Sequence, residues 1–141
     1  MSEPQELIDA RRCLASAEAD LGSEEGLAQL TEGLALLDDV IGVAPQAAER
    51  TARNLASAYA TRVYGHVADS LSRDPGLPEP VLEHFFKLVL AFDRVSAVVA
   101  PTAHALKIDV VRRLIDRYYE GYPTERKQRV LEELAQLADR D

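Results

Sequence analysis

The sequence contains few or none of several residue types on which whole classes of protein depend. Its 141 residues include one cysteine, Cys13, one methionine and no tryptophan. A single cysteine excludes an internal disulfide and any metal site built from several cysteines. No apolar run approaches the ~18 residues of a membrane-spanning helix, and the first twelve residues are acidic and polar, unlike a secretory signal. We therefore expect a cytoplasmic protein that does not bind membranes.

The motifs of common enzyme families are also missing from the sequence. It has no G-x-S-x-G, no glycine-rich phosphate loop and no H-E-x-x-H. The residues three positions before its histidines are Val63, Val81 and Pro101, so the Glu-x-x-His pairs of a di-iron helical bundle are absent. Cys13 has no histidine near it in the sequence, which favours the role of a small buried hydrophobic residue. We predict a protein that is not an enzyme and has no cofactor.

Acidic residues are concentrated in the first third of the chain. Residues 1–45 carry ten acidic side chains against two arginines, whereas residues 46–104 carry six of each sign and residues 105–141 eight of each. An acidic face repels phosphate backbones and attracts basic molecules. We therefore expect no nucleic-acid ligand and favour a basic protein or peptide partner, although surface charge of this kind also serves solubility.

Apolar residues recur at helical spacing over nearly the whole chain. The pattern predicts a single all-α domain over residues 1–141, with about six antiparallel helices at 5–21, 24–43, 46–72, 80–99, 102–120 and 125–138. Ser23 is placed to cap the second helix, and prolines at 45 and 101 and the segment 73–80 mark later breaks. Three hairpins (5–43, 46–99 and 102–138) predict a helical-repeat array or a right-angled helical bundle.

The same spacing predicts which helix faces are buried. In the first hairpin we expect Leu7, Leu14 and Leu21 to pack against Leu27, Leu34 and Ile41. On the helix 46–72 we expect one packing face (Ala52, Leu55, Tyr59, Val63, His66 and Ser70) and one face of small, weakly polar residues (Ala47, Asn54, Ala58, Thr61 and Gly65). The small face either receives another helix or forms the floor of a groove.

Two segments resemble part of a tetratricopeptide repeat. EGLALLDDVIGVAP (32–45) and RNLASAYA (53–60) are similar to the second helix of one repeat, its closing proline and the first helix of the next repeat. The matching positions are Gly33, Leu37, Pro45, Leu55, Ala56 and Tyr59. The resemblance covers about thirty residues, and the chain lacks the fixed 34-residue period of the family. It implies an array of helical hairpins that binds other proteins. Some members hold a terminal carboxylate, and Asn54 matches an amide of that clamp.

We predict that a groove between the helices 46–72 and 102–120 binds another protein or a peptide. The predicted partner-binding residues are Asn54, Thr61, Arg62, Lys107, Arg113 and Tyr119. Asp109 precedes Arg113 by four residues, which also predicts an ion pair on the helix surface. The alternative is a homodimer that self-associates through the small face of helix 46–72 or the apolar surplus of helix 80–99.

His66 and His84 are the remaining candidates for chemistry. The helical spacing puts both on packing faces and at similar heights of the hairpin 46–99, whereas His104 belongs at its far end. The pair either forms a weak metal site or pH-sensitive contact, or each ring stays neutral and bonds a nearby hydroxyl, carbonyl or tyrosine. We expect no other metal site.

Overall fold

The computed structural model describes residues 3–43, 46–118, 120, 128, 129, 132 and 136. In chain order the helices are α1 (Gln5–Ala19), α2 (Glu24–Val43), α3 (Gln46–Arg73), α4 (Glu79–Leu90), the 3-10 helix η1 (Ala91–Val98) and α5 (Pro101–Tyr118). No strand occurs in the described residues, which confirms the prediction of an all-α protein. Tyr119 and most of the helix predicted over 125–138 lie outside the described residues.

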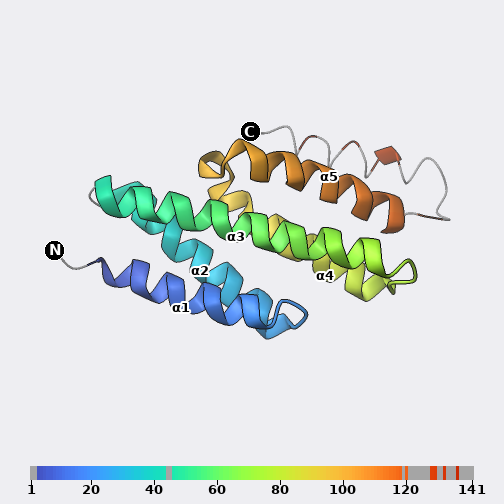
Figure 1. Ribbon diagram of the computed structural model, residues 1–141, viewed down its shortest axis with the longest axis horizontal. Coiled ribbons are helices and arrows are strands. Elements are labelled where there is room, and N and C mark those ends of the chain that lie inside the picture. Colours follow the sequence, from blue (N-terminus) through green and yellow to red (C-terminus); the bar gives the residue numbers. More distant parts are fainter. Residues whose placement is uncertain are drawn as a thin grey trace.

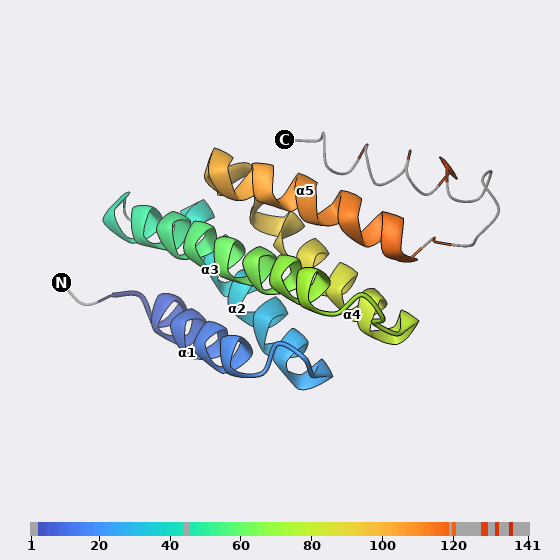
Figure 2. The ribbon, with the colours of Figure 1, turned by 45° about the vertical axis from the view of Figure 1, so that its right-hand side comes forward.

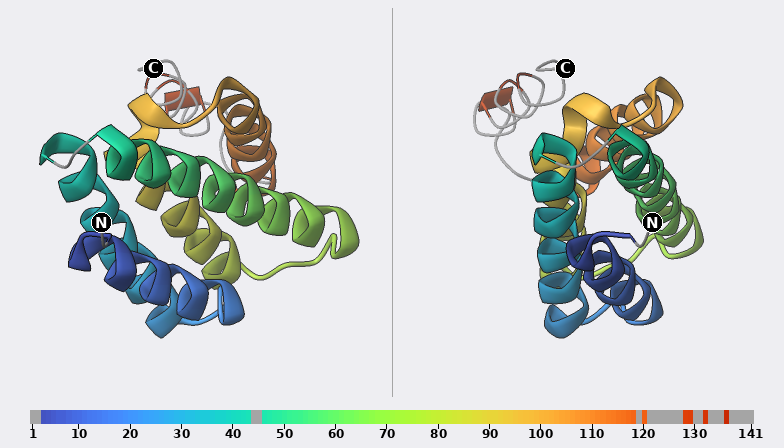
Figure 3. Two further views of the ribbon diagram at one scale, coloured as in Figure 1. Left: turned by 60° about the vertical axis from the view of Figure 1, so that its left-hand side comes forward. Right: turned by 90° about the vertical axis from the view of Figure 1, so that its left-hand side faces the viewer.

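The helices are arranged in two layers. The helices α1, α3 and α5 lie in front in Figure 1 and run in the same direction, and Figure 2 shows the same order from a second angle. The helices α2 and α4 run back behind them, and the side views separate the two layers (Figure 3). Because α3 packs against both α2 and α5, it is the central helix of the front layer.

Local signals in the sequence set the turn between α1 and α2. The hydroxyl of Ser23 accepts a hydrogen bond from the backbone N–H of Gly26 at 3.0 Å, so Ser23 caps α2 as predicted. Gly26 is also required by the packing, since a Cβ atom there would lie 1.8 Å from the backbone oxygen of Asp20. The turn is therefore fixed by one capping hydroxyl and one position that has room only for glycine.

Small residues let α1 and α2 approach closely along their length. The buried face of α1 alternates leucine and alanine (Leu7, Ala10, Leu14 and Ala17). A Cβ atom on Gly33 of α2 would lie 2.9 Å from Cγ of Leu14, so the two helices meet at this glycine. The predicted antiparallel hairpin is confirmed, but its seam differs in part: Leu34 is buried, whereas Leu27 and Ile41 are only half-buried. Leu30 and Leu37, which have the same helical spacing, are buried as expected, together with Val40.

The buried face of α3 agrees with the predicted one only in part. Its buried residues are Ala52, Ala56, Ala60, Val63, Tyr64, Val67 and Leu71. Leu55 and Tyr59 lie at the margin of the core, and His66 is exposed. The prediction was right for Ala52 and Val63 and wrong for the rest, because it followed the larger side chains, whereas Ala52, Ala56 and Ala60 bring α3 close to its neighbours. Tyr64 then fills the space beside them, with its ring 5.4 Å from that of Phe92.

The helix predicted over 80–99 is divided into α4 and η1. In a 3-10 helix, residues three apart lie on the same face. Phe92, Val95 and Val98 have this spacing, and Phe92 and Val95 are buried while Val98 is half-buried. The helical period therefore changes at Ala91, and the apolar face stays directed at the core although the backbone is no longer α-helical.

Candidate functional site

Three of the six predicted partner-binding residues lie on the outer face of α3. Asn54, Thr61 and Arg62 are all exposed. The hydroxyl of Thr61 donates to the backbone oxygen of Ser57 within its own helix at 3.0 Å. Arg62 donates to Glu18 of α1 at 3.0 Å. All three residues thus keep exposed positions on α3, the helix that lies between α1 and α5 in the front layer of Figure 1.

Small side chains occupy the middle of this outer face. Ala58 is exposed between Asn54 and Thr61, and the position of a Cβ atom on Gly65 has nothing within 4 Å. The face predicted to consist of small residues is thus directed at solvent rather than at another described helix. We call the exposed residues Asn54, Ala58, Thr61 and Arg62 the α3 face.

Lys107 does not belong to the α3 face. Its side chain is only 3% exposed, and its Nζ atom donates to Oδ1 of Asp93 at 3.0 Å. The sequence predicted that Lys107 binds a partner in a groove between α3 and α5. It is instead the one buried charged residue in the described part of the chain. Its buried ammonium group joins α5 to the exposed Asp93 of η1, so we do not include Lys107 in the proposed surface.

Arg113 and Arg117 of α5 are used to hold the end of α3. Arg113 donates to the hydroxyl of Ser72 at 2.8 Å, and its predicted ion pair with Asp109 is present at 3.8 Å. The guanidinium of Arg117 donates to the backbone oxygens of Leu71 at 2.7 Å and Asp74 at 3.2 Å. The last carbonyls of a helix have no partner within the helix, so Arg117 satisfies them. The sequence analysis missed this role, because nothing local connects Arg117 to a helix end more than forty residues away.

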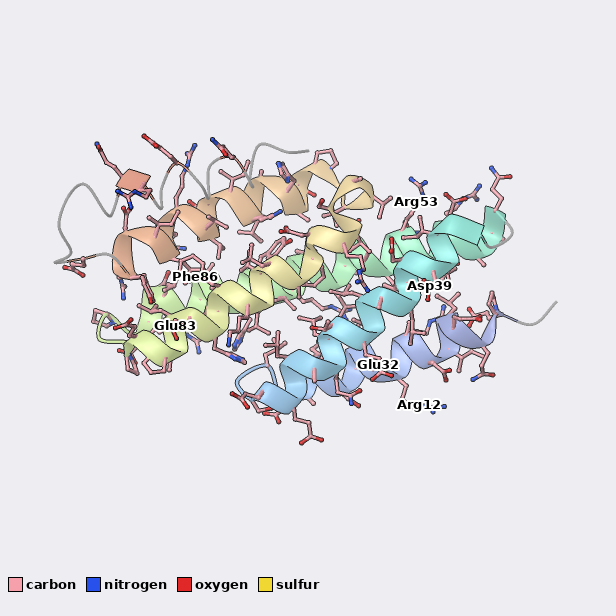
Figure 4. The ribbon with its side chains drawn as sticks, turned by 180° about the vertical axis from the view of Figure 1, so that it is seen from behind. Arg12, Glu32, Asp39, Arg53, Glu83 and Phe86 are labelled. Carbon is pink, nitrogen blue, oxygen red and sulfur yellow. The ribbon has the colours of Figure 1, made fainter. Side chains whose placement is uncertain are left out.

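Tyr118, the last residue of α5, connects the same end of this helix to α4. Its hydroxyl lies 2.9 Å from a carboxylate oxygen of Glu79 and 2.8 Å from one of Glu83, and its ring meets Phe86 edge-on at 5.8 Å. Figure 4 shows Glu83 and Phe86 on α4, seen from behind the molecule. The hydrogen bond to Glu83 is the first cause that raises the pKa of Tyr118, followed by burial and by Glu79. The phenol is therefore held in its protonated form.

The first hairpin presents acidic side chains to solvent. The helix α2 contains no basic residue, and its five acidic side chains (Glu24, Glu25, Glu32, Asp38 and Asp39) are all exposed. None of the five has an ion pair among the described residues. Glu32 and Asp39 project from α2 in Figure 4. By contrast, the acid Glu18 on α1 is paired with Arg62. The helix α2 is thus a concentration of negative charge with no basic residue of its own.

The two histidines predicted to meet do lie close to each other, but they have different surroundings. Nε2 of His84 is 2.7 Å from the backbone oxygen of Leu21, which joins α4 to the α1–α2 turn. The ring of His66 meets Phe85 edge-on at 6.1 Å. Burial lowers the pKa of His66, Asp69 opposes this, and the neighbouring His84 lowers the pKa further. His84 therefore bonds a carbonyl, as one of the two alternatives predicted, and the described residues contain no cluster of three side chains suited to a metal ion.

Two further features carry no site. Cys13 is half-buried, and the pKa of its thiol is raised by burial first and then by Glu32 and Asp9, which disfavours the reactive thiolate. At the start of α3 a shallow concavity is lined by Gln46, Glu49, Arg50 and Arg53. Arg53 is paired with Glu49 at 2.6 Å within this concavity.

Comparison of the chain with protein-family models, with curated proteins and with solved structures found no match. None of the described helices has the length and apolar character that crossing a membrane requires.

Proposed function

We propose that the protein is a non-enzymatic binding module of the tetratricopeptide-like type, which holds another protein or a peptide on the α3 face. The observation that carries this proposal is the exposed, low-relief centre of α3. Asn54, Ala58 and Thr61 are exposed there and lie between α1 and α5. A partner segment placed along α3 would contact small side chains and one free amide, which allows its backbone to come close.

The two-layer order of the helices supports this proposal. In a tetratricopeptide array the first helices of successive hairpins form one layer and line the binding face. The helices α1, α3 and α5 have that placement in Figure 1 and Figure 3, with α2 and α4 behind them.

The charge of the first hairpin favours a basic partner. The helix α2 carries five exposed acidic residues and no basic ones. Charge of one sign on an exposed surface raises the rate of encounter with molecules of the opposite sign, and salt weakens this effect. We expect α2 to act on the rate of association, while contacts on the α3 face determine the lifetime of the complex.

Burial of the α4 residues removes one of the two surfaces considered for the alternative, a homodimer, whereas the small face of α3 is exposed and could serve either function. The apolar surplus of α4 is used inside the molecule, where Leu82, Phe85, Leu88 and Val89 are buried. Among the described residues the only large hydrophobic side chain that is exposed is Ile8, at 38%. Light scattering decides between the two, with a monomer expected for the binding module and a dimer for the bundle.

Site-directed photocrosslinking tests the proposed face. A photoreactive amino acid replaces Ala58 on the α3 face, and a matched variant carries it at Ala28, which is exposed on α2. We expect the Ala58 variant to crosslink a defined partner in the native cell, and this partner to be lost when Asn54→Ala and Thr61→Ala are added. Equal crosslinking of the same proteins from both positions would contradict the proposal.

A further inference from the structure

Residues 91–98 combine an α-helical sequence pattern with a 3-10 backbone. From Val81 to Val99 apolar residues recur at spacings of three and four, the period of an α-helix. The helix α4 follows this pattern as far as Leu90, and η1 then continues directly from it for eight residues. Runs of 3-10 helix longer than three or four residues are uncommon because their hydrogen-bond geometry is poorer. The 3-10 form of this segment therefore depends on contacts made outside it.

Two polar contacts join the segment and the residue that follows it to the front layer. Nζ of Lys107 on α5 donates to Oδ1 of Asp93 at 3.0 Å, and the lysine side chain is almost fully buried. Just beyond the segment, the backbone N–H of Ala100 donates to the hydroxyl of Ser57 on α3 at 2.9 Å. Asp93 is 40% exposed, but the ammonium group of Lys107 is buried and favours keeping this carboxylate as its partner. The position of Asp93, and with it the winding of η1, is thus coupled to α5.

Two adjacent valines make both windings compatible with a buried apolar face. In the 3-10 form Phe92, Val95 and Val98 share a face. In an α-helix, Val99 would take the place of Val98 on this face. The two forms differ by about 20° and 0.5 Å per residue, which accumulates to about 160° and 4 Å over the segment. Counted from Ala91, rewinding turns Asp93 by about 40° and shifts it by about 1 Å, which disturbs its pair with Lys107, and the larger change at the far end moves Ala100 away from Ser57.

We propose that residues 91–98 form a two-state segment that exchanges between a 3-10 and an α-helical form, held in the 3-10 form by the ion pair between Lys107 and Asp93. The segment is linked to the α3 face through Ala100, which follows it and bonds Ser57. Ser57 lies one helical turn from both Asn54 and Thr61. A ligand that prefers one of the two forms shifts the equilibrium between them. The proposal concerns the free protein and does not require a partner to be known.

NMR of the full chain tests this proposal. Contacts between Hα of residue i and the amide of residue i+2 identify a 3-10 helix, and contacts to residue i+4 identify an α-helix. In the wild type we expect the 3-10 pattern over residues 91–98. In Lys107→Met, which keeps the aliphatic stem but removes the charge, we expect the ratio of α-helical to 3-10 form to rise at least about tenfold.

Two further variants keep the test decisive. Asp93→Asn removes the other charge of the pair and is expected to shift the segment in the same direction, so the proposal stays testable if Lys107→Met does not fold. Lys87→Met is the matched control, because Lys87 is exposed on α4 and its loss changes the net charge equally. An α-helical pattern in the wild type, an unchanged 3-10 pattern in the folded variants, or an equal shift in Lys87→Met would each overturn the proposal.

Discussion

The α1–α2 hairpin and the α4–η1–α5 region are held together in different ways. Where α1 meets α2, small residues form the contact: Ala10 and Ala17 are fully buried, and Gly33 faces Leu14. The α4–η1–α5 region combines large apolar side chains with polar groups that reach between elements, such as Lys107 to Asp93. Close backbone approach is specified by the residues of the two helices alone. Long polar side chains, in contrast, bond groups that are distant in the sequence, and these groups come within reach only in the complete fold.

Because large side chains fill the core of the α4–η1–α5 region, truncating one of them in η1 is expected to have the largest effect on stability. Phe92 is fully buried and packs edge-on against Tyr64. We expect Phe92→Ala to lower the free energy of unfolding by about 3–5 kcal/mol, because the cavity is only partly filled by relaxation. Urea denaturation measures this. Phe86→Ala, at a half-buried position, is the control and should cost clearly less. Because Phe86 also has an edge-on ring partner, Tyr118, equal losses would mean that the full burial of Phe92 adds nothing to its contribution.

In the first hairpin the sensitive position is a glycine instead. A methyl group on Gly26 would lie 1.8 Å from the backbone oxygen of Asp20, and backbone atoms have no alternative rotamer. We expect Gly26→Ala to destabilise the protein by about 3 kcal/mol. Gly65→Ala is the matched change at an open position within α3, and should stabilise by up to about 1 kcal/mol through helix propensity. Thermal unfolding followed by circular dichroism compares the two, and tolerance of Gly26→Ala would show that the turn has room to shift.

The bounds of several helices followed from local sequence. The range 24–43 predicted for the second helix agrees with α2, because Gly22 and Ser23 end one helix and cap the next within a few residues. The α3 bounds were predicted within one residue at the C-terminal end. Such signals act between near neighbours in the chain, and the rest of the fold does not alter them.

The face of α3 and the role of Lys107 did not follow from local sequence. Spacing alone ranked Leu55 and Tyr59 above Ala56 and Ala60, although the alanines are the residues that are fully buried. Which side of a long helix faces the core depends on how closely its neighbours approach. Likewise, Lys107 is buried with its ammonium group bonded to Asp93 of η1, and nothing in the local sequence of α5 indicates that partner.

A third prediction tests the polar contacts that join α5 to the end of α3. Arg117→Met removes the donors to the backbone oxygens of Leu71 and Asp74 while it keeps an apolar stem. We expect a loss of about 1–3 kcal/mol, because a part-buried carbonyl then lacks its partner. Arg112→Met, at an exposed position on the same helix, should change stability by less than about 0.5 kcal/mol. Similar values for the two variants would show that Arg117 does not stabilise the end of α3.

The smallest expected effect is a dependence of stability on pH at the junction of the two regions, where His84 of α4 bonds the α1–α2 turn and His66 lies beside it. Burial lowers the pKa of His66 in the folded protein, and His84 lowers it further, against the opposing effect of Asp69. The unfolded chain, with an ordinary histidine pKa of about 6.5, therefore binds this proton more readily than the folded chain. Stability from this group is present above pH 6.5, falls as the pH drops through that value, and levels off below the pKa of the folded state.

Because the side chain of His66 is exposed, we expect the protein to lose less than about 1 kcal/mol of stability between pH 7.5 and 5. Urea denaturation of the wild type and of His66→Gln at both pH values measures the difference, and His104→Gln serves as control. If His66→Gln and the wild type lose the same stability on acidification, His66 contributes nothing to the pH dependence, and other groups account for it.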